Sequence, residues 1–116
     1  GKKDNQDDVD YLLEKIINLR IFEDDAGKLN LSAADLNKDL MLVSQFTLFG
    51  DCRQGRRPSF FVAASPAEAE KIYDYFVAEA DKTELKIETG MFQAKMNVSL
   101  ENDGPVTILL DSKKKF

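Results

Sequence analysis

Two short polar segments hold the side chains best suited to bind or act on a small ligand. Ser44-Gln45-Phe46-Thr47-Leu48 follows the apolar run 40–43, and Asn102-Asp103-Gly104-Pro105 separates two alternating stretches. Ligand sites in α/β sheets often lie where a buried strand ends. Hydroxyl groups and main-chain N–H groups at such an end could bind an ester carbonyl or a ribose. The same groups could instead satisfy the local backbone, so the pattern leaves both interpretations open.

The second segment has the residues of a hairpin turn. Asn-Asp-Gly between two alternating stretches is typical of such a turn, but Pro105 removes a backbone N–H where the next strand would begin. A bond to proline also permits a cis peptide. Gly104 has no side chain, so a ligand could approach its carbonyl closely. A plain turn and a ligand-contacting turn both fit these residues.

The sequence has no histidine and a single cysteine, Cys52. A Ser-His-Asp triad, a Cys-His pair and histidine-based metal ligation are therefore excluded. Neither Ser44 nor Thr47 has an evident lysine partner, so neither hydroxyl resembles an activated nucleophile. Asp24 and Asp25 fall in a predicted turn, where we expect solvated carboxylates. We predict no metal and no cofactor, and a chemistry that depends on positioning.

The formal net charge of −5 argues against a protein that coats nucleic acid. Two local clusters could still hold phosphate groups: Arg53, Arg56 and Arg57 form one, and Lys113–Lys115 form the other. A solvated loop and a solvated tail explain these clusters as well. We interpret Phe60-Phe61 as part of a core or an interface rather than as a base-stacking platform.

Local start signals predict the helices that position these segments. Apolar residues recur every three or four positions over 8–19, which predicts a first helix. A second helix begins after Ser65, because Pro66 suits its first position and Glu68 completes a capping box. The segment Ser32–Asp35 resembles a capping box that opens a single helical turn.

Apolar patterning predicts four strands. The continuous run 40–43 predicts a strand that is buried on both faces. Alternation of apolar and polar residues predicts half-buried strands over 85–89 and 96–100, followed by a last strand over 106–110. We interpret 49–64, with its glycines and arginines, as a long loop. Helix, strand, helix and three closing strands make a mixed α/β pattern.

The length of 116 residues predicts one domain, spanning 1–116. No apolar run reaches the roughly 20 residues that a membrane-spanning helix needs, and no apolar stretch near Gly1 has the form of a signal peptide. We therefore expect a cytoplasmic protein with no membrane contact. One central and three C-terminal strands form a small sheet for two helices, so we expect N-terminal strands to be missing from this chain.

Several segments in order resemble the D-aminoacyl-tRNA deacylase family. They are Ser44–Leu48, Asn102–Thr107, Gly55–Phe60, Thr89–Met96 and Leu19–Asp24. The resemblance covers essentially the whole chain, and the common order and spacing of these segments make it specific. It implies a mixed α/β fold with the order β(2)-(βα)2-β(3) in β/β/α layers, whose N-terminal strands this chain lacks. Gln93 departs from the family, because many relatives have glycine there.

The resemblance also implies a homodimer with an active site at the subunit interface. The pocket floor and the catalytic groups would come from Ser44, Gln45, Phe46 and Thr47, with catalysis by main-chain groups near Thr47 and by the ribose hydroxyl of the substrate. Gly104 and Pro105, joined by a cis peptide bond, would enter the active site from the other subunit and exclude L-residues. The remaining site residues would be Met96 and Phe60 at the substrate and Arg53, Arg56 and Arg57 at the tRNA.

The substrate that the resemblance implies is a D-amino acid, or glycine, esterified to the terminal ribose of tRNA. Two alternatives stay open beside it. A non-catalytic module for tRNA or single-stranded nucleic acid would use the basic clusters and Phe60-Phe61. A general esterase would need an activated nucleophile, and the sequence shows none.

Overall fold

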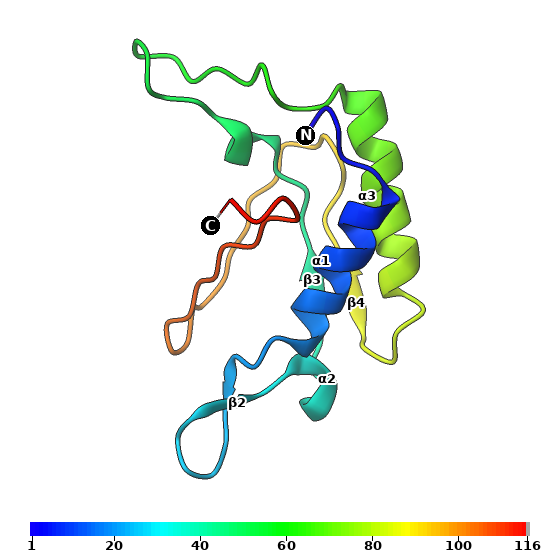
Figure 1. The fold of residues 1–116 in the computed structure, drawn as a ribbon, viewed down its shortest axis with the longest axis vertical. Coiled ribbons are helices and arrows are strands. Elements are labelled where there is room, and N and C mark those ends of the chain that lie inside the picture. Colours follow the sequence, from blue (N-terminus) through cyan, green and yellow to red (C-terminus); the bar gives the residue numbers. More distant parts are fainter. Residues whose placement is uncertain (116) are drawn as a thin grey trace.

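The computed structural model describes residues 1–115 and contains three α-helices, one 3-10 helix and four short strands within them. Figure 1 shows α1 and α3 side by side, with β3 and β4 behind them and a long loop that extends away from the body and returns to the beginning of α3. None of the described helices is both long and apolar enough to cross a membrane. In chain order the elements are α1 (Gln6–Asn18), β1 (Phe22–Glu23), β2 (Leu29–Leu31), α2 (Ala33–Leu36), β3 (Leu40–Leu42), η1 (Phe46–Phe49), α3 (Pro66–Ala80) and β4 (Ile87–Thr89).

The helices begin where their capping residues predict. At α3 the Ser65 amide donates to the Glu68 carboxylate at 3.2 Å, and the Glu68 amide donates back to the Ser65 hydroxyl at 3.4 Å. The same reciprocal box opens α2 at Ser32, and Asn5 opens α1. Each box satisfies N–H groups that a helix start leaves without partners. The predicted starts of α2 and α3 are therefore confirmed, whereas α1 begins at Gln6, earlier than the predicted start at Asp8.

The core lies between α1, α3 and the parallel pair β3–β4. Leu40 pairs with Ile87 and Leu42 with Thr89 along this pair. Leu42 is 6% exposed and packs in one cluster with Leu13 of α1 and Ala80 of α3. The antiparallel hairpin β1–β2 lies apart from this cluster. The core thus fixes the direction in which the chain leaves β3, which is where the first polar segment begins.

Three strand predictions are wrong. The run 40–43 was expected to be buried on both faces, but Met41 is 62% exposed because no described element packs on its side of β3. The strands expected over 96–100 and 106–110 do not form. Alternation favours a strand only when a neighbouring chain pairs with its N–H and C=O groups. In the described chain these residues form an exposed arm, residues 97–111, which is the orange-to-red hairpin of Figure 1.

An ion pair ties the end of this arm to α1. The Lys113 ammonium binds the carboxylate of Asp8, which is 8% exposed in the first turn of α1. Hydrogen bonds from Lys113 and Ser112 hold the pKa of Asp8 at about 2, below its usual value. The Lys114 ammonium also lies 5.8 Å from the ring centre of Tyr11. A solvated tail was one interpretation of the basic cluster Lys113–Lys115. In the structure Lys113 of this cluster instead anchors the arm to α1.

Candidate active site

A groove of about 760 Å³ runs between the helices, the end of β3 and the loop that follows η1. Its walls are mainly apolar side chains of α1, α3 and residues 43–49, and the carboxylates Asp4 and Asp8 also line it. A groove of this size and character suits a ligand with an apolar body and a few polar groups. Five residues that were predicted from the sequence to belong to the site line this groove: Ser44, Gln45, Phe46, Phe60 and Met96.

The chain leaves β3 and enters the groove lining at the point where the hydrogen-bonded pairing of β3 with β4 ends. The last ladder contact is a hydrogen bond of 2.9 Å from the Gly90 amide to the Leu42 carbonyl. Beyond it, Ser44 and Gln45 lie outside any sheet, and the 3-10 helix η1 begins at Phe46. The predicted polar strand end is thus a strand followed by a tight helical turn.

Thr47 lies in η1 but does not line the groove, and its side chain is exposed to solvent. Its carbonyl accepts a hydrogen bond of 3.0 Å from the Gly50 amide. The Phe46 and Thr47 amides, at the start of η1, donate to no acceptor among residues 1–115. N–H groups at the beginning of a helical turn lack intrahelical partners and can bind an oxygen that carries negative charge.

Aromatic contacts hold the groove walls in place. Phe46 and Phe60 pack edge to face with ring centres 4.9 Å apart, which joins η1 to the long loop. On the opposite side Tyr73 of α3 lies 5.8 Å from Phe92 and donates a hydrogen bond of 3.0 Å to the Leu42 carbonyl. Burial raises the pKa of Tyr73 above its usual value, so the phenol stays a neutral donor. These contacts link the core to the groove.

The segment that leads from β4 to the arm forms the rim of the groove. Met96 accepts a hydrogen bond of 3.4 Å from the Met91 amide through its sulfur. Gln93 has a φ of 61°, in the left-handed region that favours glycine. This conformation gives a physical reason for the glycine that many family members were expected to have, and here the rim carries a glutamine side chain instead.

Gly104 and Pro105 do not meet the groove of their own chain. Both are exposed at the tip of the arm, and the peptide bond between them is cis. The Val106 amide donates to the Asn102 side chain at 3.2 Å, which closes the turn. One chain therefore brings the two predicted polar segments to different places: Ser44–Phe46 at the groove and Gly104-Pro105 away from it.

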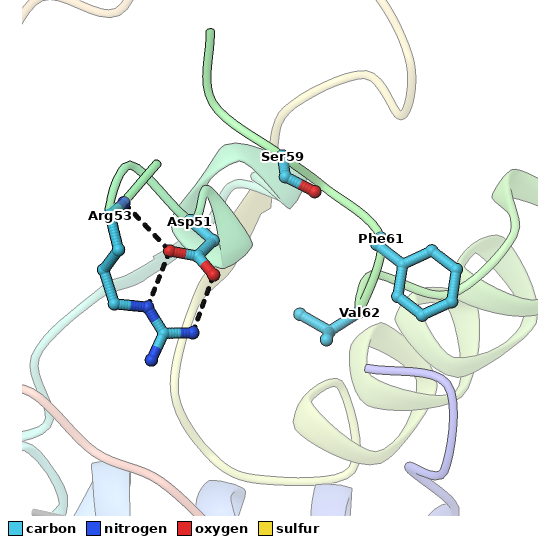
Figure 2. A pocket seen from close by; sticks show the side chains of 5 residues that line it. All are labelled: Asp51, Arg53, Ser59, Phe61 and Val62. Carbon is cyan, nitrogen blue, oxygen red and sulfur yellow. Dashed lines mark hydrogen bonds and ion pairs between the residues drawn. The ribbon is translucent and has the colours of Figure 1, made fainter. Parts of the chain in front are cut away.

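The three arginines lie in the loop that joins η1 to α3. Asp51 and Ser59 exchange two main-chain hydrogen bonds of 2.8 and 2.9 Å, which close the loop at its base. Figure 2 shows Arg53 folded onto Asp51, with its Nε and one terminal nitrogen 2.8 and 2.7 Å from the two carboxylate oxygens. Hydrogen bonds from Arg53 lower the pKa of Asp51 to about 2. Arg56 and Arg57 are exposed at the loop tip.

Several groove residues were not predicted from the sequence. Val43, Tyr73 and Phe92 line the groove, but their only signal was apolar character, which they share with core residues.

Phe61 was expected in a core or an interface with Phe60, yet its side chain is 77% exposed and lies outside the core of this chain. Phe61 lies in a turn that a hydrogen bond of 3.0 Å from the Ala63 amide to the Phe60 carbonyl closes, and it does not line the groove that Phe60 lines. Within residues 1–115 no group of three or more acidic or cysteine side chains could hold a metal ion.

Comparison with known proteins gives one consistent family. The model of the D-Tyr-tRNA(Tyr) deacylase family matches residues 1–111. A D-aminoacyl-tRNA deacylase of Halothermothrix orenii is 63% identical over 116 residues, covering all of this chain and 78% of the relative. One of Thermosipho africanus is 61% identical with the same coverage. The solved structure of a c-Myc DNA Unwinding Element Binding Protein has a TM-score of 0.83 and 40% identity, covering 92% of this chain and 73% of that one.

Matches of this extent place the chain among the hydrolases with this mixed α/β fold. The chain belongs to the D-Tyr-tRNA(Tyr) deacylase family. The resemblance in the ordered sequence segments and the fold class inferred from it are therefore confirmed. The roles of the individual site residues stay predictions.

Proposed function

We propose that this protein hydrolyses the ester bond between a D-amino acid and the terminal ribose of tRNA, and that it does so in the cytoplasm. Family membership supports the reaction. The observation that carries the proposal is the apolar groove lined by Ser44, Gln45 and Phe46, next to main-chain N–H groups that have no acceptor among residues 1–115. Such a groove can hold an amino acid side chain and present its ester carbonyl to those donors.

The chemistry in this proposal comes from the main chain and from the substrate. The amides of Phe46 and Thr47 donate hydrogen bonds to the ester oxygen as it gains negative charge, each contributing roughly 3 kcal/mol. Water attacks the ester carbonyl carbon, and the bond from that carbon to the ribose oxygen breaks. The ribose hydroxyl beside the ester is held close enough to pass a proton from the water to the leaving oxygen, so proximity lowers the barrier further. A chain without histidine can carry out this reaction, because no side chain has to be activated as a nucleophile.

Selection against L-residues in this proposal needs a second copy of the chain. In a homodimer, Gly104 and Pro105 of one subunit enter the groove of the other and occupy the space that an L side chain needs. Their exposure at the tip of the arm leaves them available for such a contact. Met96 and Phe60 line the rest of the space. Glycine has no side chain to exclude, so it passes with the D-residues.

The experiment that tests this function compares two charged tRNAs. We expect the protein to release D-tyrosine from D-Tyr-tRNA and to leave L-Tyr-tRNA intact, with kcat/KM values that differ at least about 100-fold. Release of labelled tyrosine from each ester at equal concentration measures the ratio. Equal hydrolysis of the two enantiomers, or of neither, would contradict the proposal.

A second expected result separates the main-chain mechanism from a side-chain mechanism. Thr47→Ala removes the hydroxyl but keeps the backbone N–H, so we expect kcat for D-Tyr-tRNA to stay within about threefold of the wild type. Thr47→Val is the matched variant, because it keeps the side-chain size without the hydroxyl. A loss of several hundredfold in both variants would make the Thr47 hydroxyl the nucleophile and would support a general esterase mechanism.

A non-catalytic nucleic-acid module is the second candidate. The solved relative that is 40% identical is named a c-Myc DNA Unwinding Element Binding Protein, and this name favours DNA binding for that relative. The exposed Arg56 and Arg57 are the groups of this chain that would serve such binding. A module of this kind requires affinity that falls steeply with salt and an absence of ester hydrolysis. The charge of −5 disfavours it.

A further inference from the structure

A second, smaller cavity lies on the other side of the loop wall that lines the groove. It measures about 370 Å³ and is lined by Asp51, Arg53, Ser59, Phe61 and Val62. Figure 2 shows Val62 facing the Asp51–Arg53 pair across an open space, with Ser59 above it, whereas the ring of Phe61 points away from that pair. Its volume is at the lower end of the roughly 300–1,000 Å³ that small-ligand sites have.

Successive residues of the loop divide the two cavities. Phe60, Ala63 and Ala64 line the large groove, whereas Ser59, Phe61 and Val62 line the small cavity. This stretch contains a turn closed by the hydrogen bond of 3.0 Å from the Ala63 amide to the Phe60 carbonyl, and it forms a wall that the two sites share. A ligand that fills the groove and continues over the edge of this wall enters the small cavity directly.

The small cavity offers an aromatic surface next to positive charge. The ring of Phe61 has the Lys2 ammonium 3.7 Å from its centre on one face, yet the side chain stays 77% exposed, so the other face is open. Val62, 53% exposed, extends this apolar surface. Nucleobases stack on exposed aromatic rings of this kind.

Arg53 lines the same cavity as Phe61. Asp51 binds two of its three guanidinium nitrogens, so the group is held in one orientation. The remaining terminal nitrogen has no partner among residues 1–115 and can donate to a phosphate oxygen. A base surface and a phosphate donor in one cavity are what one nucleotide of single-stranded RNA needs.

We propose that the small cavity is the subsite for the nucleotide that precedes the esterified terminal nucleotide of tRNA. The base stacks on the open face of Phe61, the face that Lys2 does not cover, and the phosphate meets Arg53. This proposal rests on the proposed function, because it assumes that the terminal aminoacyl nucleoside occupies the groove. It assigns Arg53 to the acceptor end and leaves Arg56 and Arg57 to more distant phosphates.

The test compares an ester that reaches the subsite with one that does not. D-Tyr-tRNA contains the preceding nucleotide, and D-tyrosyl-adenosine ends before it. We expect Phe61→Ala to raise KM about tenfold for D-Tyr-tRNA with kcat unchanged, and to leave both constants for D-tyrosyl-adenosine unchanged. Phe61→Tyr keeps the stacking surface and should stay within about twofold of the wild type on both esters.

Equal kinetics of Phe61→Ala and the wild type on D-Tyr-tRNA would overturn the subsite and leave the proposed function standing. An equal loss on both esters would overturn it too, because the ring would then support the groove rather than bind a nucleotide. If the wild type hydrolyses neither ester, the proposed function fails. Binding of an uncharged RNA tetranucleotide ending in adenosine then decides the subsite: Phe61→Ala should weaken it about tenfold, and unchanged affinity refutes it.

Discussion

Gly104→Ala is expected to lower the ratio of D to L hydrolysis, measured as kcat/KM on the two tyrosyl-tRNAs, by about 100-fold. Gly104 has a φ of 132°, a backbone conformation that only glycine adopts without strain. A Cβ added there would lie 3.2 Å from the amide nitrogen of Val106 and 3.2 Å from its side chain. The turn must therefore shift, and the carbonyl groups proposed to occupy the L side-chain space shift with it.

The matched control for this variant is Gly27→Ala. Gly27 also has a positive φ, 70°, but it lies in the β1–β2 hairpin and a Cβ there would meet nothing within 4 Å. We expect this variant to keep the full D-over-L ratio. Circular dichroism and the melting temperature of Gly104→Ala should match the wild type, since the arm is exposed. If the Gly104→Ala protein folds and keeps the D-over-L ratio of the wild type, Gly104 does not take part in excluding L-residues.

Leu42→Ala is expected to destabilise the protein by about 3 kcal/mol, the range for a large-to-small change in a packed core. Leu42 is 6% exposed and lies where α1, α3 and β3 meet. Its carbonyl also receives the hydrogen bonds from Tyr73 and Gly90, which the substitution leaves in place. For a chain of this length the loss corresponds to a fall in melting temperature of about 10 °C.

Met41→Ala, one residue earlier, is the control for that experiment. The Met41 side chain is 62% exposed on the opposite face of β3, so its removal should cost less than about 0.5 kcal/mol. Urea unfolding of the two variants under identical conditions measures the difference. Similar losses at both positions would mean that the exposed face of β3 is covered in solution and that the described core is incomplete.

The parts of the fold that the sequence predicted well are those with local causes. Ser65 and Glu68 lie three positions apart, and their capping box depends on nothing outside the first turn of α3. Strand pairing is different, because a partner strand must lie alongside. The alternation over 96–100 describes a segment that could pair, but it cannot supply the partner, and in this chain the segment stays exposed.

The candidate site was predicted in part for the same reason. Ser44 and Gln45 were found because polar residues directly follow an apolar strand, and they do lie at the groove. The 3-10 helix that follows was not predicted, since its start depends on where the β3–β4 ladder ends. Nothing in the pair Phe60-Phe61 shows which ring faces the groove. That assignment follows from the closure of the loop at Asp51 and Ser59.

The closure of that loop has a use in protein engineering. The two main-chain hydrogen bonds between Asp51 and Ser59, together with the Arg53–Asp51 clamp, fix both ends of the tip 54–57 before it leaves the body of the protein. The tip lines neither cavity. Longer or differently charged tips can therefore be exchanged as cassettes between these two fixed ends. A library of such cassettes would tune affinity for RNA while the machinery of ester cleavage stays constant.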